Sequence, residues 1–273
     1  MIGIFAQTRD EVQTILDNVT INSSKTVGNI TIYNVTNNGN TFYVIITGVG
    51  KVNAALGLTY ALVKLCIKKV IVVGNTASLD ETAAAIGSVA IATSSLEWDV
   101  DYEALGYDAN VVPNNNVSNY PTDPNLLKEA VTTSNGLGYT TVSGVYATGD
   151  TFVATTTEAS EINTETGALF LDNNSGAIGQ VSYQMNIPYI VIKGVSNYAN
   201  DTAVTDFNTN KENANNLSNR VALSLLNTLF EETPSICCNN NTTNNVIAYP
   251  CAYRSYVNQG LCFNNINRNN FYL

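Results

Sequence analysis

The chain contains no histidine, so it has no His-based catalytic triad, no histidine metal ligand and no histidine proton shuttle. Charge is also scarce: 12% of the residues are charged, and 22 acids against 12 bases give a formal net charge of -10. No basic stripe is present to neutralise phosphates, so nucleic acid is not an expected partner. Any chemistry must therefore depend on carboxylates, amides and backbone groups.

Long apolar runs and a leader are missing as well. No stretch approaches the roughly 20 apolar residues that cross a bilayer, so we expect no membrane partner. The chain as given begins without the basic region and cleavage site of a signal peptide. Asn and Thr stand in for much of the usual Lys and Glu, and this composition alone accounts for the many Asn-x-Ser/Thr sequons. The sequons and the C-terminal cysteines leave glycosylation and an extracellular or particle-surface location open.

What is present is an alternation of short apolar runs with helical stretches over residues 1–230, which predicts an α/β layer fold. Strands are predicted at residues 2–6, 30–35, 42–47, 70–73, 89–93, 141–147, 168–172 and 189–196. Helices are predicted at residues 9–17, 52–67, 125–133, 158–166, 176–185 and 206–230. We expect a three-layer fold in which helices flank both faces of one central mixed sheet.

Two further segments differ from this α/β pattern in their amino-acid composition. Residues 107–124 contain Pro113, Pro121 and an asparagine run, which is typical of a long surface loop or lid. Residues 231–273 form an Asn/Cys/Tyr-rich C-terminal extension whose aromatic content favours docking, either on its own domain or on a neighbouring subunit.

Cysteines gather in the C-terminal extension, at Cys237, Cys238, Cys251 and Cys262. Four cysteines allow three pairings into two disulfides, although the adjacent pair must find different partners. Reduced thiols are the alternative. A zinc site is disfavoured because the spacing lacks a tight Cys-x2-Cys element and no histidine is available, so we expect neither a metal nor a cofactor.

A glycine turn at residues 47–51 closes a strand and opens a helix, which presents backbone N–H groups at a helix N-terminus. Together with residues 1–12, 70–79 and 101–107, this segment resembles the 5′-methylthioadenosine/S-adenosylhomocysteine nucleosidases of the nucleoside phosphorylase superfamily. Residues 148–152, 172–181 and 195–197 continue the resemblance in the same order. The resemblance covers about residues 1–230 and implies the nucleosidase-like α/β fold.

The resemblance also implies site residues, and here the chain departs from the family. A family glutamate that activates water corresponds to Glu11, but the aspartate that protonates the purine corresponds to Asn197, and a ribose-binding glutamate corresponds to Asn174. An amide cannot act as a general acid, because its protons are not acidic near neutral pH. The remaining positions implied to bind substrate are Gly48, Asn75, Phe152, Asn173 and Ser196.

These substitutions leave two main hypotheses, beside a third possibility in which the protein binds or stores a nucleoside without turnover. The main prediction is a protein with the nucleosidase fold and a degenerate active site. We expect it to have a structural or self-assembling role, with filaments as one form of assembly. The resemblance implies that the building block of this assembly is a dimer. The alternative is a purine nucleoside-cleaving enzyme with altered base preference, in which Glu11 orients water and Asn197 binds the base. Phosphorolysis is disfavoured because Arg9 is the one arginine near the expected site, and a helix-start arginine is more simply a surface charge.

Overall fold

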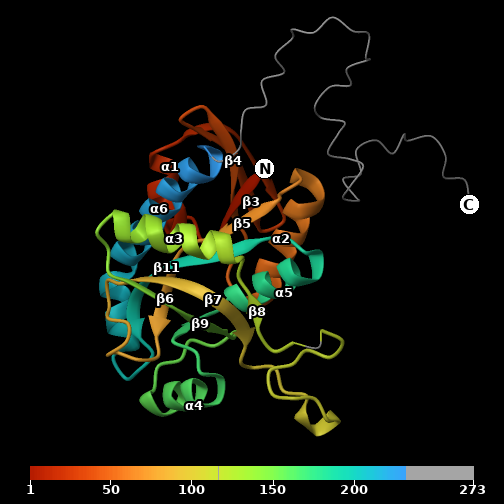
Figure 1. Ribbon diagram of the computed structural model, residues 1–273, viewed down its shortest axis with the longest axis vertical. Helices are drawn as coiled ribbons and strands as arrows, with labels where there is room; N and C mark the ends of the chain where they lie inside the picture. The colour runs from red at the N-terminus through yellow and green to blue at the C-terminus, as the bar shows by residue number, and fades with distance from the viewer. Residues whose placement is uncertain (116, 232–273) are drawn as a thin grey trace, which may run out of the picture.

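The computed structural model describes residues 1–115 and 117–231 (Figure 1). Its strands are β1 (Ile2–Ala6), β2 (Thr20–Val27), β3 (Ile30–Asn37), β4 (Asn40–Ile46), β5 (Lys69–Val72), β6 (Asn75–Ser78), β7 (Val89–Glu97), β8 (Tyr120–Pro121), β9 (Thr141–Thr148), β10 (Phe170–Asp172) and β11 (Tyr189–Tyr198). Its helices are η1 (Asp10–Val12), α1 (Gln13–Asp17), α2 (Lys51–Leu65), η2 (Glu103–Leu105), α3 (Pro124–Gly136), α4 (Thr156–Thr166), α5 (Ser175–Met185) and α6 (Ala203–Glu231).

One mixed, 11-stranded sheet runs through the molecule in the order β2-β3-β4-β1-β5-β11-β6-β10-β9-β7-β8. The strands β4, β1, β5 and β11 are parallel neighbours, whereas β2, β3 and β4 form antiparallel hairpins. The long strand β11 also pairs with β7, which closes β11, β6, β10, β9 and β7 into a ring. This junction places the ends of β6, β10 and β11 beside one another.

Two apolar layers hold the helices against the sheet, and β1 shows how the sequence divides them. Ile4 faces the layer that contains α1, α3 and α6, whereas Phe5 faces the layer that contains α2 and α5. Successive side chains of a strand point to opposite faces, so an uninterrupted apolar run suits a strand that is buried on both sides. A third, smaller cluster lies under α4. Figure 1 shows α3 and α6 on one side of the sheet and α2 and α5 on the other.

The predicted fold class is confirmed, and the differences lie in short or polar elements. The sequence patterns missed β2, β6 and β8. Strand β2 is exposed along almost its whole length and lacks an apolar face, so its pairing with β3, and not burial, makes it a strand. The expected helix at residues 9–17 is split, because Val12 leaves the helical region with φ -124° and ψ 9°.

In the described part of the predicted lid at residues 107–124, the regular elements are the short strand β8 and the start of α3. Among the described residues, no helix is both long and apolar enough to span a bilayer. The predicted C-terminal extension, with Cys237, Cys238, Cys251 and Cys262, lies outside the described residues. Its boundary at residue 230 therefore stays a prediction, as do the disulfides.

Candidate active site

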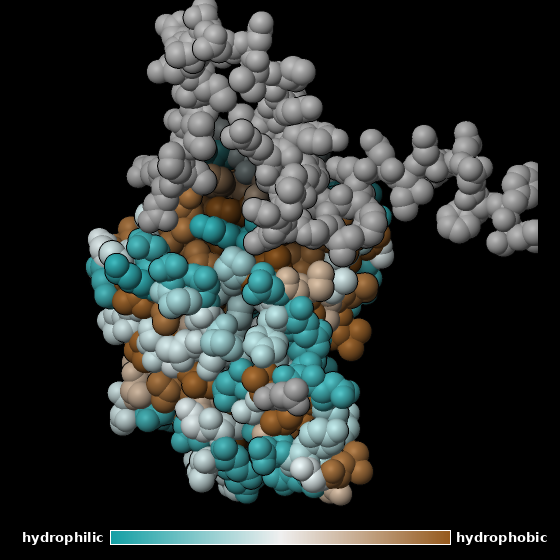
Figure 2. Space-filling model, turned by 45° about the vertical axis from the view of Figure 1, so that its right-hand side comes forward, coloured by the Kyte–Doolittle hydropathy of each residue, from teal (hydrophilic) through white to brown (hydrophobic). Residues whose placement is uncertain are grey.

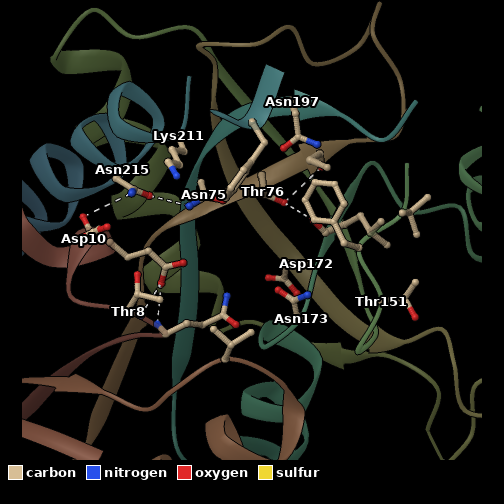
Figure 3. Close-up of a pocket in the computed structure, with 18 residues that line it drawn as sticks. Thr8, Asp10, Asn75, Thr76, Thr151, Asp172, Asn173, Asn197, Lys211 and Asn215 are labelled. Atoms are coloured by element: carbon tan, nitrogen blue, oxygen red, sulfur yellow. Dashed lines mark hydrogen bonds between the residues drawn. The ribbon is translucent and has the colours of Figure 1, made fainter. Parts of the chain in front are cut away.

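A cavity of about 410 Å³ opens where β6, β10 and β11 meet η1 and α6 (Figure 3). Most of the residues that line it carry amide, hydroxyl or charged groups, although apolar atoms form the larger part of its surface. The lining residues are Gln7, Thr8, Asp10, Glu11, Val49, Asn75, Thr76, Ala77, Thr151, Phe152, Val153, Leu171, Asp172, Asn173, Asn197, Phe207, Lys211 and Asn215.

Glu11 is the buried carboxylate on the η1 side of this cavity. The chain turns immediately after β1, and the Glu11 Oε2 accepts a 2.7 Å hydrogen bond from the Gln7 backbone N–H and a longer one from Thr8. Gly74 lets β5 approach closely, since a Cβ there would lie 2.9 Å from the Glu11 Cδ and its φ of +135° is one that favours glycine. Burial raises the pKa of Glu11, although the Lys193 ammonium and the backbone hydrogen bonds oppose that shift.

Asp172 is the second buried carboxylate of the cavity, and both of its oxygens have hydrogen-bond or ion-pair partners. Its Oδ2 lies 2.6 Å from the Lys193 Nζ, and its Oδ1 accepts a 2.6 Å hydrogen bond from the Thr148 hydroxyl. Ser175 donates to it from both its hydroxyl and its backbone N–H. Burial pushes the pKa of Asp172 upward, but Lys193 and these donors outweigh burial and hold the pKa below its ordinary value.

Asn174 is drawn into the same buried network. Lys193 donates a 2.6 Å hydrogen bond to the Asn174 Oδ1, so one ammonium bridges Asn174 and Asp172. Asn174 is 0% exposed and does not line the cavity, and its Nδ2 has no hydrogen-bond partner among the described residues. The side chain therefore serves the Lys193 pair rather than a ligand in this arrangement.

Asn197 also lines the cavity, near the end of β11. Its Oδ1 accepts a 2.7 Å hydrogen bond from the Ser196 hydroxyl, and its Nδ2 donates at 3.0 Å to the Tyr198 carbonyl. These two bonds fix the orientation of the amide. A primary amide nitrogen carries two donors. One donor of Asn197 thus remains for an acceptor in the cavity, within the part of the chain that the structure describes.

The glycine turn before α2 supports the cavity but does not line it at Gly48. Gly48 and Gly50 have φ values of +93° and +94°. The Gly50 N–H donates to the Gln7 Oε1, and the Lys51 N–H donates at 2.9 Å to the Asp150 Oδ1. The helix N-terminus is thus capped by side chains of the protein itself, which leaves fewer donors for an external anion.

Helix α6 also contributes to the cavity wall, and the amide of Asn75 points toward this helix. The Asn75 Nδ2 donates at 2.9 Å to the Asn215 Oδ1, and the Asn215 Nδ2 reaches the Asp10 carbonyl at 3.5 Å. Figure 3 shows these three residues and Lys211 along one side of the cavity.

The structure brings five of the predicted site residues together around the cavity, namely Glu11, Asn75, Phe152, Asn173 and Asn197. The other three predicted residues, Gly48, Asn174 and Ser196, do not line the cavity. Sequence reasoning missed Phe207, Lys211 and Asn215, because they lie on one face of the long helix α6 and no local motif marks them. Asp172 lies in the segment 172–181 that resembles the family, but the sequence analysis assigned it no role in the site.

Comparisons with known proteins place this geometry in context. The model of the phosphorylase superfamily matches residues 1–229. A 5′-methylthioadenosine/S-adenosylhomocysteine nucleosidase from Staphylococcus haemolyticus is 29% identical over 208 residues, which cover 76% of this chain and 90% of that protein.

Two solved structures from Helicobacter pylori share the fold. The futalosine hydrolase has a TM-score of 0.79 and 22% identity, and the match covers 83% of this chain and 97% of that one. An aspartate-to-asparagine mutant of the 5′-methylthioadenosine/S-adenosylhomocysteine nucleosidase, solved with 5′-methylthioadenosine in its active site, has a TM-score of 0.80 and 22% identity. That match covers 83% of this chain and 98% of the mutant.

Proposed function

This chain belongs to the phosphorylase superfamily, and from that membership and the cavity's geometry we propose that it is a purine nucleosidase with altered base preference. The observation that carries the proposal is that the Glu11 carboxylate and the Asn197 amide line the same cavity. The named relatives are nucleosidases or a hydrolase, which supports cleavage of a nucleoside more directly than a structural role.

In the proposed reaction, a water molecule attacks the sugar carbon C1′ while the bond from C1′ to the base nitrogen breaks. The ionised Glu11 accepts the proton of the water, and the electron pair of the broken bond goes to the base. Glu11 suits this role because, among the described residues, it is the buried cavity carboxylate without an ammonium partner within salt-bridge distance; Asp10 has no such partner either, but it is exposed.

Asn197 sets the base preference in this proposal. Its free N–H donates a hydrogen bond to the departing base but supplies no proton, so the best leaving base is one whose negative charge spreads onto an acceptor that the amide reaches. A 6-oxopurine meets this requirement through its O6 and N7 atoms. The Helicobacter pylori mutant, in which an asparagine replaces an aspartate, also holds a nucleoside in its active site.

Hydrolysis is proposed in preference to phosphorolysis. Two of the donors at the start of α2, the Gly50 and Lys51 N–H groups, are engaged by Gln7 and Asp150, and no arginine belongs to the described lining of the cavity. A phosphate dianion beside Asp10 and Glu11 would also face two carboxylates.

The proposal is tested by base release from inosine, guanosine, 5′-methylthioadenosine and S-adenosylhomocysteine, with and without phosphate. We expect release from the 6-oxopurine nucleosides without phosphate dependence, and none from a Glu11→Gln variant. Asn197→Asp provides the matched comparison and should shift the preference toward the adenine nucleosides. Absence of release from every nucleoside, in the wild type and in the Asn197→Asp/Asn174→Glu double variant, would contradict the proposal.

A structural role remains a second candidate because one face of α2 is strongly apolar and open. Val52, Leu56 and Val63 are 77%, 56% and 50% exposed, and α2 packs beside α5, whose Tyr183 is also exposed. Figure 2 turns this side of the molecule forward and shows apolar patches between polar residues. Exposed apolar side chains along one helix favour association with a second copy.

We therefore propose a homodimer as the building block, whether or not the cavity is active. Sedimentation of wild type and Leu56→Glu should show a dimer that the substitution converts to a monomer. Negative-stain microscopy tests the further prediction of filaments, and deletion of residues 234–273 tests the predicted docking role of the C-terminal extension. Discrete dimers that release a base would contradict the filament prediction.

A further inference from the structure

A second cavity, of about 390 Å³, lies between helix α2 and the strands β2, β3 and β4. Small-molecule sites in proteins have volumes of roughly 300–1,000 Å³, so this cavity is large enough for a small ligand. It shares no lining residue with the cavity that contains Glu11. We call it the β2–α2 cavity. The polar side chains of its lining are those of Ser23, Lys25, Asn34, Tyr43, Tyr60 and Lys64.

The strand register builds one wall of the β2–α2 cavity. Ser23 pairs with Asn34, and Asn34 pairs with Tyr43, so three polar side chains form a row across β2, β3 and β4. Lys25 follows Ser23 by two residues and therefore lies on the same face of β2. Its partner in the register, Ile32, is buried and contributes apolar surface to this wall.

Helix α2 forms the other wall through Tyr60 and Lys64. These two residues are four positions apart, so they lie on the same face of the helix. The Lys25 Nζ donates a 3.5 Å hydrogen bond to the Tyr60 hydroxyl, which joins the two walls. Both lysines therefore lie beside Tyr60, although they come from different elements.

The charge of this region is positive, in contrast to the molecule as a whole. Residues 18–79 contain five lysines and no arginine, aspartate or glutamate, whereas the whole chain has a formal net charge of -10. In the described chain, no carboxylate lies within 4.0 Å of the Lys25 or Lys64 ammonium, unlike those of Lys51 and Lys193. Folding thus brings two unpaired cations to one cavity.

The two cavities differ in the anion that they tolerate. Asp10, Glu11 and Asp172 line the first cavity and repel a dianion, whereas the β2–α2 cavity has no carboxylate in its described lining. Two ammonium groups match the charge of a dianion, and one is enough for a carboxylate. Further donors are free for a phosphate with several oxygens, because the Tyr43 hydroxyl and the Asn34 amide nitrogen have no hydrogen-bond partner among the described residues.

From this arrangement we propose that the β2–α2 cavity binds a phosphate monoester of a small organic molecule. Lys25 and Lys64 hold the phosphate, and the rings of Tyr43 and Tyr60 flank the organic part. This site lies outside the candidate active site, and the inference does not rest on the proposed function.

The test measures the binding of phenyl phosphate to the full-length wild-type protein by calorimetry, beside benzoate and benzyl alcohol. At about pH 7.5 a phosphate monoester carries close to two negative charges. We expect phenyl phosphate to bind about fivefold more tightly than benzoate, the upper range for one additional exposed ion pair, and benzyl alcohol to bind most weakly. Added salt should reduce these preferences, because it screens exposed charges.

Lys25→Gln and Lys64→Gln should each weaken phenyl phosphate binding by about two- to fivefold, and the double variant by about tenfold. Both lysines are exposed, so these variants should fold normally. Lys68→Gln is the matched control, since Lys68 is an exposed lysine of the same acid-free segment that lines neither cavity. Lys211→Gln reports on the first cavity, and both of these variants should bind phenyl phosphate as the wild type does.

Three results would overturn the phosphate site: no binding of phenyl phosphate, equal affinity for benzoate, or an affinity that the Lys25→Gln/Lys64→Gln variant leaves unchanged. Loss of binding in Lys211→Gln would also overturn it, because the phosphate would then occupy the first cavity. Base release from nucleosides is measured separately, so failure of this site and failure of the proposed function are distinguishable.

Discussion

Glu11 and Asp172 are two carboxylates of the same cavity, nearly equally buried, with opposite electrostatics. They are 6% and 8% exposed. The pKa of Glu11 is raised by burial, whereas the pKa of Asp172 is held low by Lys193 and by hydroxyl donors. Burial alone therefore does not decide the protonation of a carboxylate here, because the nearest cation does.

In the proposed reaction, this difference divides the cavity into a reactive side and a structural side. Glu11 has backbone donors but no ion pair among the described residues, so in this proposal it exchanges a proton with a bound water. Asp172 is neutralised by Lys193, which also binds Asn174 and holds β10, β11 and the start of α5 together. Groups whose environments push their pKa values apart commonly take different roles in a site.

Loss of the Glu11 carboxylate should have the largest effect on function. Glu11→Gln keeps the hydrogen bonds from Gln7 and Thr8 but removes the base, so we expect kcat for base release to fall by about 10²- to 10⁴-fold. Circular dichroism and thermal unfolding check that the variant remains folded. Unchanged cleavage would show that Glu11 is not the base of the reaction, and the proposed functional difference between Glu11 and Asp172 would then be wrong.

Loss of the Lys193 ammonium should have the largest effect on stability. Lys193→Met leaves Asp172 buried without its cation, which costs about 3–5 kcal/mol for a fully buried pair. The measurement is the free energy of unfolding from denaturant titration, with the slope checked against that of the wild type. If the double variant Lys193→Met/Asp172→Leu recovers stability, the loss comes from the unpaired charge and not from packing.

The pH dependence of activity and stability should separate the two carboxylates further. Since the reaction needs ionised Glu11 and its pKa is raised, kcat/KM should begin to fall on acidification at a higher pH than for an ordinary glutamate. Stability responds in the opposite sense. The contribution of protonated Glu11 is complete below its unfolded-state pKa and is lost as the pH rises through its folded-state pKa.

Asp172 predicts the reverse pH behaviour. Its pKa is lowered, so its contribution is present above the unfolded-state pKa and is lost as the pH falls through the folded-state pKa. Unfolding titrations over a pH series, compared between wild type and Glu11→Gln, check both signs. A Glu11→Gln curve that parallels the wild type would show that Glu11 does not titrate differently on folding.

The smallest effect is expected at the more exposed pair Lys51 and Asp99. Their side chains are 19% and 26% exposed, so Lys51→Met should cost less than about 1 kcal/mol. This variant is the control for Lys193→Met, because both remove a lysine 2.6 Å from an aspartate. A loss as large as that of Lys193→Met would mean that burial is not what makes the Asp172 pair important.

Local sequence determined most of the fold. The apolar run of β1 and the periodic apolar face of α2 each imply their own element, and the glycines at positions 48 and 50 supply the positive φ values that the turn requires. Strand β2 could not be found in this way, because its residues are nearly all polar and exposed, and it exists through pairing with β3.

For the site, the sequence by itself determined that a carboxylate follows β1 and that an amide ends β11, because both residues lie within a few positions of recognisable strands. Only the tertiary structure decided that Lys193 binds Asp172 and Asn174, and that Glu11 has no ion pair within the part of the chain that the structure describes. It also decided that Lys211, more than a dozen residues beyond β11, borders the same cavity. Charge pairing across elements depends on packing in three dimensions, and no local pattern encodes it.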